Sequence, residues 1–488
     1  MLSLLYLQLC LSVVFAKYQP TWPSLDSRPL PSWYDESKFG IFCHWGAYSV
    51  PAYKESAWLW WYWKGGKTDK DVVSYIERNY KPGTTYADFA RDFTAELFDP
   101  KEFADIVKSS GAKYFVLTSK HHEGFTLWPT RTSWNWNSVD IGPKRDIVGE
   151  LRDAFKGTDI HYGLYFSQFE FFHPLYLDDK KYNTTAYVEQ VSYPQLLEIV
   201  NRYKPEVVWS DGDWEKSDEY WKSKEFLAWL YNTSPIKDNV VVNDRWGQGS
   251  IGKHGGFLTF SDHFDPGKLV ARKWENCMTL DKLAWGSRRT MKSSDVHTVH
   301  ELVEQLARTV SCGGNLLLNV GPDMHGKIPP IFEDRLRELG RFLNASSEAL
   351  YRTKPWIHQN DSGNTWYTSR ISSATLPKNR LYNPQIEGQT IVYAWVLDMP
   401  TKDLELKMVK TTERTKITFL GTNVSFEPGA RSTLLVNFNS IPWRQLIRND
   451  VMVLKIENAA SQTLGSNIYE RRSRVRRLLD FSWSYDAF

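Results

Sequence analysis

Short apolar runs alternate with longer segments of helical pattern from about residue 38 to about residue 320, and this alternation restricts the folds that the chain can adopt. The apolar runs are FGIFCHW, KYFVLTSK, IHYGLYFS, EVVWSD, NVVVND and GGNLLLNVGP. Segments such as DPKEFADIVKSSGA and SYPQLLEIVNRYKP lie between them, with an acidic residue or serine at the start, apolar residues three and four apart, and glycine or proline at the end. Near-continuous apolar strands are typical of a parallel sheet covered on both faces, and this many repeats favours a closed (β/α)8-like barrel. An open doubly wound sheet is the alternative, although no glycine-rich dinucleotide loop follows the first strand.

The pattern changes after about residue 352. TIVYAWVLDM, ELKMV, TKITFLG, STLLVNF and VMVLKIEN are short apolar runs separated by turn-forming residues, with little helical pattern between them. This arrangement indicates a C-terminal antiparallel β-sandwich. A chain of 488 residues is also too long for one ordinary core. We therefore expect an α/β barrel over residues 17–352 and a β-sandwich over residues 353–465.

The first residues, MLSLLYLQLCLSVVFA, form an apolar run that is too short to span a bilayer and that ends in small residues suited to signal peptidase. We expect residues 1–16 to be a cleaved signal peptide. No later stretch approaches about 20 uninterrupted apolar residues, so no membrane span is expected. Five Asn-x-Ser/Thr sequons follow, at Asn183, Asn232, Asn344, Asn360 and Asn423. Together these features predict a glycoprotein of the secretory pathway, either lysosomal or secreted.

Cysteine usage gives no disulfide framework. Removal of the signal removes Cys10 and leaves Cys43, Cys277 and Cys312, an odd number at wide spacing. Two arrangements stay open, either buried free thiols or one pair with an unpaired third cysteine.

Charge and aromatic content limit the partners. The formal net charge is +3, with acidic and basic residues mixed along the main body, so we expect no nucleic-acid partner. Aromatic residues make up 15% of the chain and include 22 Trp, which suits stacking on sugar rings but also fits a Trp-rich core. Residues 466–488 carry the basic cluster ERRSRVRRLLD. Three interpretations of this tail stay open: a solvated tail, a protease processing site, or an anchor to an anionic surface.

Polar side chains follow nearly every apolar run. These strand-end residues are His44 and Trp45, His121, His122 and Glu123, Tyr165 and Ser167, Asp211, and Asn243, Asp244 and Arg245. In a parallel barrel the carboxyl ends of all strands meet at one rim, where active sites are built. The sequence therefore predicts one site at that rim.

The types and spacing of these residues favour carboxylate chemistry. Adjacent His121 and His122 face different directions on a strand, which argues against a metal site, and we expect neither a metal nor another cofactor. No G-x-S-x-G motif supports a serine nucleophile. A pair of carboxyl groups with His, Arg and aromatic neighbours is what hydrolysis of a glycosidic bond requires.

The ordered motifs KFGIFCHWGAYSVP, KYFVLTSKHHEGF, WSDGDW, NDRWG, KWENC and GGNLLLNVGP resemble those of the retaining α-L-fucosidases of glycoside hydrolase family 29, animal tissue type. The resemblance extends from about residue 20 to about residue 356. It implies a (β/α)8-like catalytic barrel followed by a β-sandwich. It also implies hydrolysis of terminal α-L-fucose through a covalent fucosyl-enzyme intermediate, with fucosylated glycans and glycoproteins as substrates.

The resemblance also assigns residues. Asp211 matches the nucleophile and Glu275 the general acid/base, with Asp262 of FSDHF as the reserve candidate for the second role. Fucose-contacting positions match His44, Trp58, His121, His122, Tyr165, Trp209 and Arg245. One position departs from the family, because Ala57 stands where many relatives have a fucose-binding Glu. The neighbouring Glu55 is a candidate to replace it.

Two other functions stay open. Ala57 leaves room for a fucose-binding lectin with weakened catalysis, and a barrel glycosidase for another sugar would share the carboxylates but not the His-rich pocket. An apolar wall near C5 of the sugar separates fucose from galactose. The sequence does not fix the oligomeric state, so a homo-oligomer also stays open.

Overall fold

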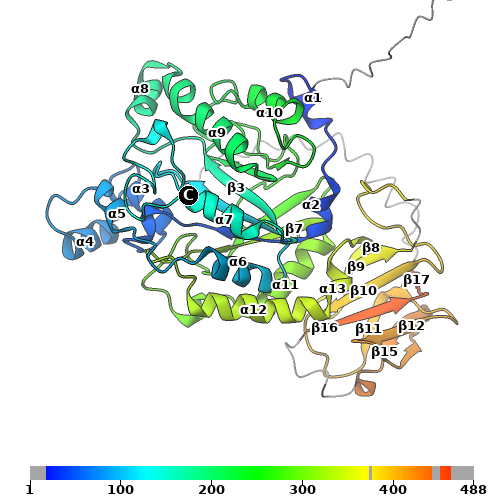
Figure 1. Cartoon of the computed structure of the whole chain (residues 1–488). Helices are drawn as coiled ribbons and strands as arrows, with labels where there is room; N and C mark the ends of the chain where they lie inside the picture. The colour runs from blue at the N-terminus through cyan, green and yellow to red at the C-terminus, as the bar shows by residue number, and fades with distance from the viewer. Residues whose placement is uncertain (1–17, 373–375, 442–443, 445–450, 463–488) are drawn as a thin grey trace, which may run out of the picture. The chain divides into compact units, whose positions relative to one another are not determined.

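The computed structural model describes residues 18–372, 376–441, 444 and 451–462 (Figure 1). The expected signal peptide, residues 1–16, and the basic tail, residues 466–488, lie outside the described residues. The chain divides into two units. The first runs to Lys354 and includes Pro377–Leu381, and the second comprises Pro355–Leu376 and the residues from Tyr382 onward.

The first unit is built on a parallel sheet. Its seven strands are β1 (Phe39–Cys43), β2 (Tyr114–Lys120), β3 (His161–Ser167), β4 (Val207–Asp211), β5 (Val241–Val242), β6 (Trp274–Thr279) and β7 (Gly314–Val320). They follow the order β5-β4-β3-β2-β1-β7-β6, and every neighbouring pair is parallel.

Residues 256–259 occupy the eighth position, between the two edges of this sheet. The backbone N–H of Phe257 donates to the Val242 carbonyl of β5 at 3.1 Å, and the N–H of Glu275 in β6 donates to the Leu258 carbonyl at 2.8 Å. This segment therefore links β5 to β6 and closes the barrel, which confirms the (β/α)8-like fold expected from the alternating pattern.

Alternate strand residues fill the barrel interior. Side chains two positions apart on one strand point to the same face, and Tyr114 with Val116 and Val207 with Trp209 form such pairs in the interior cluster. The other buried members of this cluster are Tyr34, Phe42, Tyr165, Val241, Phe257, Cys277 and Leu317. Large aromatic side chains thus fill the barrel interior below its carboxyl end. A site can therefore form only at the rim of that end.

Helices cover the outside of the barrel. Those that follow strands are α6 (Pro100–Ser109), α7 (Ile147–Phe155), α9 (Tyr193–Tyr203), α10 (Ser223–Asn232), α11 (Val299–Ser311) and α12 (Pro330–Ala345). Their order in space is α11, α12, α6, α7, α9, each in contact with the next (Figure 1). Side-chain caps fix where they begin: Asp99 accepts the backbone N–H of Lys101 and Glu102 at the start of α6, and Thr298 forms a capping box with Glu301 in α11.

The remaining helices precede the barrel, lie in its loops or follow its last helix. They are α1 (Trp22–Asp26), α2 (Ser32–Ser37), α3 (Leu59–Trp63), α4 (Lys70–Asn79), α5 (Tyr86–Asp92), α8 (Pro174–Tyr182) and α13 (Ser347–Leu350). Among the residues that the structure describes, no helix combines the length and the apolar character needed to cross a bilayer.

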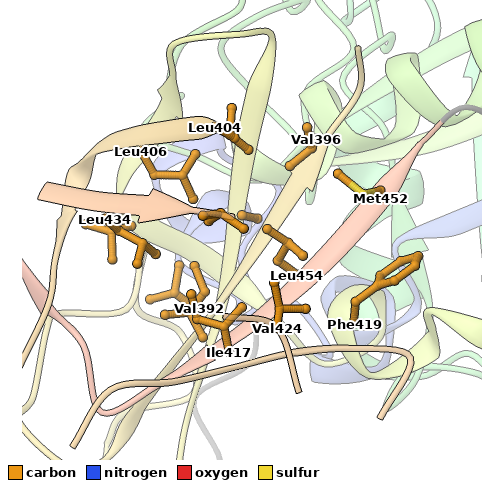
Figure 2. Packing of buried hydrophobic residues seen from close by; sticks show 14 of the residues in the cluster. Val392, Val396, Leu404, Leu406, Ile417, Phe419, Val424, Leu434, Met452 and Leu454 are labelled. Atoms are coloured by element: carbon orange, nitrogen blue, oxygen red, sulfur yellow. The ribbon is translucent and has the colours of Figure 1, made fainter. Parts of the chain in front are cut away.

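The second unit is an antiparallel β-sandwich, as predicted. Its strands are β8 (Lys354–Asp361), β9 (Thr365–Ile371), β10 (Thr390–Val396), β11 (Leu404–Lys410), β12 (Lys416–Phe419), β13 (Thr422–Asn423), β14 (Phe426–Pro428), β15 (Thr433–Val436), β16 (Met452–Glu457) and β17 (Ala460–Ser461). One sheet has the order β13-β12-β16-β10-β9-β8 and the other β14-β15-β11-β17. Figure 2 shows how apolar side chains of both sheets, among them Val392, Leu406, Leu434 and Leu454, meet in one core.

The structure decides between the two cysteine arrangements. Cys43, Cys277 and Cys312 are all buried free thiols. The sequons differ in exposure, because Asn183, Asn344, Asn360 and Asn423 are exposed, whereas Asn232 is half-buried. The Asn232 amide nitrogen donates to the carbonyls of Tyr18 and Ala228, both at 2.8 Å, and a glycan on that nitrogen would leave it only one N–H for the two bonds.

Close packing of α12 on α6 gives a prediction about stability. A Cβ atom at Gly340 would lie 1.7 Å from the Ser109 carbonyl oxygen. Alanine is a better helix former than glycine by about 1 kcal/mol, but the clash is with backbone and outweighs this gain. Gly340→Ala should lower the free energy of unfolding by about 1–3 kcal/mol. Thermal and denaturant unfolding measure the change, with Arg341→Ala, at the next and exposed position of the same helix, as the matched control. An increase in stability would show that the helices separate easily here.

Candidate active site

A pocket of about 400 Å³, including its opening to solvent, lies at the carboxyl end of the barrel. Its lining residues are Phe42, His44, Trp58, His121, Tyr165, Trp209, Asp211, Trp214, Arg245, Asp262 and Trp285. The structure thus brings together all the catalytic and fucose-contacting residues that the resemblance assigned, except His122 and Glu275. Phe42, Trp214 and Trp285 were not expected. Phe42 and Trp214 lie within strand-end motifs and Trp285 lies in the loop after β6, but an aromatic residue at such positions is equally typical of a core.

Asp211 is the last residue of β4, and two donors hold its carboxylate. The Tyr165 hydroxyl donates to Oδ2 at 2.7 Å, and the Arg245 Nη1 donates to Oδ1 at 2.9 Å. His122 Nε2 lies 3.5 Å from Oδ2. The carboxylate is therefore fixed in orientation at the floor of the pocket, as an attacking group must be.

Arg245 joins Asp211 to a second carboxylate. Its Nη2 donates to Asp262 Oδ1 at 2.6 Å, while Nε donates to the Thr259 hydroxyl at 3.1 Å and the guanidinium lies 4.7 Å from the Trp209 ring centroid. Burial alone would raise the pKa of Asp262, but Arg245 outweighs it, and the pKa is lowered from its ordinary value. One buried cation thus holds two carboxyl groups in the same pocket.

Two of the histidines have tautomers fixed by their partners. His44 Nδ1 lies 2.7 Å from the Asn319 side-chain oxygen, and a carbonyl oxygen can only accept, so Nδ1 carries the proton. His122 Nδ1 donates in the same way to the Ser167 hydroxyl at 2.7 Å, because that hydroxyl donates to the Phe169 carbonyl. Burial lowers the pKa of each imidazole to about 4. Both rings are therefore neutral above that pH, and each leaves Nε2 as an acceptor.

His121 has a different neighbour. Its Nδ1 lies 3.8 Å from Glu123 Oε2, and both side chains are buried. Burial raises the pKa of Glu123 to about 8 and lowers that of His121 well below its ordinary value. This pair is therefore neutral at neutral and acidic pH, whereas at neutral pH Arg245 is a cation and Asp262, with its lowered pKa, an anion.

The structure places Glu275 away from the pocket. It is the second residue of β6, fully buried in the barrel interior, and its carboxylate accepts three hydrogen bonds. The donors are the Tyr34 hydroxyl at 2.5 Å, the Tyr114 hydroxyl at 2.7 Å and the Trp209 indole at 2.9 Å. A general acid must reach the leaving oxygen, and a carboxylate beneath Trp209 does not. The expectation that Glu275 is the acid/base residue does not fit this geometry, whereas the reserve candidate Asp262 lies in the pocket.

Glu55 does not replace the missing family Glu in the pocket. Its Oε2 accepts the Trp285 backbone N–H at 2.8 Å, and its Oε1 accepts that of Ala57 at 3.3 Å. Burial raises the pKa of Glu55 to about 7. Glu55 therefore links the two loops that carry Trp58 and Trp285, and Ala57 itself is buried.

Within the described ranges, no three or more His, Cys, Asp or Glu side chains are grouped as metal ligands would be.

A parallel barrel with two carboxylates, neutral imidazoles and aromatic rings around one pocket at its carboxyl end defines a glycoside hydrolase. The family described as Alpha-L-fucosidase matches residues 5–348. The chain belongs to the α-L-fucosidase family.

Relatives support this assignment over most of the chain. A Putative alpha-L-fucosidase of Caenorhabditis elegans is 65% identical, over 94% of this chain and 97% of that protein. The Plasma alpha-L-fucosidase of Homo sapiens is 48% identical over 90% and 88% of the two chains. The crystal structure of Thermotoga maritima alpha-fucosidase in complex with fucose is 31% identical with a TM-score of 0.72, and covers 90% of this chain and 100% of that chain. All three relatives carry the name of an α-fucosidase, and none of them supports the alternative of a fucose-binding lectin.

The contacts of Glu275 predict the outcome of Glu275→Gln. An amide has one acceptor oxygen in place of two, so one of the three donors would face another N–H group. The variant should lose about 1–3 kcal/mol of unfolding free energy. Any loss of kcat/KM should be the same for aryl fucosides with good and poor leaving groups, because no proton donor has been removed. Denaturant unfolding and a leaving-group series measure the two effects. Unchanged stability with a loss confined to poor leaving groups would restore Glu275 as the acid.

Proposed function

We propose that this α-L-fucosidase is a retaining exo-glycosidase that removes terminal α-L-fucose from fucosylated glycans and glycoproteins by double displacement. The observation that carries the proposal is the Arg245 bridge between Asp211 and Asp262 in one pocket. Retaining enzymes need two carboxyl groups about 5–5.5 Å apart, one as nucleophile and one as acid/base. A single guanidinium that donates to both is consistent with that spacing.

In the first step Asp211 attacks C1 of fucose. The C1–O bond to the leaving group breaks as the bond from C1 to the Asp211 carboxylate forms. The protonated form of Asp262, which its lowered pKa limits to acidic pH, gives its proton to the leaving oxygen. In the second step Asp262, now ionised, takes a proton from water, and the resulting hydroxide attacks C1 and releases Asp211. Two inversions at C1 give the α anomer of fucose.

The lining of the pocket suits a 6-deoxy sugar. The Nε2 atom of His44 is an acceptor for a sugar hydroxyl, and Phe42, Trp209 and Trp285 give apolar surface for the C6 methyl group. Galactose would place a hydroxyl near such surface without a partner, which costs free energy. Turnover of an aryl fucoside against an aryl galactoside separates these two sugars.

We place the enzyme in the secretory pathway, lysosomal or extracellular. This rests on the N-terminal sequence, the sequons and the names of relatives as plasma and tissue forms. Exposed Asn183, Asn344, Asn360 and Asn423 are the proposed glycan sites.

Removal of the nucleophile tests the double displacement. Asp211→Ala should lower kcat for an aryl fucoside by roughly 10⁴-fold or more, since no covalent intermediate can form. Added azide should restore part of the rate and give β-fucosyl azide, because it attacks in one step. Proton NMR of wild-type product should show α-fucose first. Asp238→Ala, an exposed carboxylate outside the pocket, is the control. Near-normal activity of Asp211→Ala, or β-fucose from wild type, would overturn the mechanism.

Replacement of Asp262 tests the acid/base role. The acid form must be present for proton donation, and the pKa of Asp262 is lowered, so wild-type kcat/KM should fall as pH rises above the acidic range. Asp262→Asn should lower kcat/KM for a poor leaving group by roughly 10²- to 10⁴-fold and remove that pH dependence. A dinitrophenyl fucoside, whose leaving group needs no proton, should be affected far less. Glu275→Gln is the matched carboxyl-to-amide control. Equal losses on both substrates would exclude Asp262 as the acid.

A further inference from the structure

The lining of the pocket changes from a buried floor to an open aromatic rim. Seven lining residues are at most 7% exposed, namely Phe42, His44, His121, Tyr165, Trp209, Asp211 and Arg245. The others, Trp58, Trp214, Trp285 and Asp262, are only partly buried. Trp214 is 38% exposed, a large apolar surface for a residue beside a polar site.

Neighbouring groups hold the Trp214 ring in place despite this exposure. Its ring is nearly perpendicular to those of His122 and Phe169, with both centroids at 5.5 Å. It is nearly parallel to the Trp58 ring, at 22° and 6.1 Å. The backbone carbonyl oxygen of Trp214 accepts a hydrogen bond from the Gln248 side-chain amide at 3.0 Å. A fixed indole loses little conformational entropy when a ligand binds to it.

We propose that Trp214 binds the sugar to which fucose is attached. This deepens the proposed function and rests on it. If fucose fills the buried floor with C1 at Asp211 and the leaving oxygen at Asp262, the next sugar must lie at the rim. Trp214 follows Asp211 by three residues and lines the same pocket, so its open surface is available to that sugar.

The chemistry of the rim points to a neutral pyranose. An indole face packs well against the C–H face of a sugar ring. Three of the four rim residues are tryptophans and the fourth is Asp262, so none of them is a cation that could pair with an anionic sugar. The ligand class is therefore a hexose or N-acetylhexosamine.

Two substrates that differ only on the leaving-group side test this subsite. The first is a disaccharide of fucose α-linked to N-acetylglucosamine, and the second is α-L-fucosyl fluoride, whose leaving group is too small to reach Trp214. Trp214→Ala should lower kcat/KM for the disaccharide about tenfold and leave that for the fluoride within about twofold. Trp214→Phe should keep most of the activity on the disaccharide. Trp134→Ala, at a more exposed tryptophan, 77%, that does not line the pocket, is the matched control.

The outcomes distinguish a failure of the Trp214 subsite from a failure of the proposed fucosidase activity. Wild-type turnover of the fluoride tests the fucosidase activity by itself, and its absence would refute the proposed function. With wild-type turnover present, an unchanged disaccharide kcat/KM in Trp214→Ala would refute the subsite. Equal losses on both substrates would also refute it, by assigning Trp214 to the fucose pocket.

Discussion

The active site depends on one buried cation, the guanidinium of Arg245. Desolvation of Arg245 and of the Asp211 carboxylate is costly, and the ion pairs offset this cost only with good geometry and further hydrogen bonds. Both conditions are met, since Nη1 and Nη2 each donate to a separate carboxylate and Nε donates to Thr259. Truncation of this arginine would leave neighbouring negative charges without compensation, so the position tolerates little change. Lysine cannot replace the planar fork.

Beneath this cation lies a column of contacts that extends through the barrel. Trp209 lies under the guanidinium, and its indole N–H donates to Glu275. Glu275 in turn accepts from Tyr34, which precedes the barrel, and from Tyr114 at the start of β2. The carboxylate expected to act on substrate thus supports the residue on which Arg245 rests.

The sequence predicted the barrel, the sandwich and the floor of the pocket, because periodicity and strand ends report which face and which end of the sheet a residue occupies. Asp211, His44 and Tyr165 were identified in this way. Depth along a strand was not predicted for Glu275, since KWENC does not show where the strand starts, and the motif suggested a role that its position does not fit. Trp214 and Trp285 were not predicted, because the sequence does not distinguish an exposed aromatic residue in a loop from one that packs in the core. The eighth barrel position, residues 256–259, has no apolar run long enough to be recognised as a strand.

That eighth position joins the barrel to the catalytic groups. Residues 256–259 form hydrogen bonds to Val242 of the two-residue strand β5 and to the start of β6, and we call this junction the seam. Its ladder of backbone hydrogen bonds is shorter than those between the long strands. Thr259, which orients Arg245, lies in the seam, and Asp262 follows three residues later. Local opening of the seam would separate the two carboxylates while the rest of the barrel stays folded. On heating, loss of activity should therefore begin below the temperature at which the protein unfolds. Activity would then report whether the seam is intact, and spectroscopy whether the whole fold is intact.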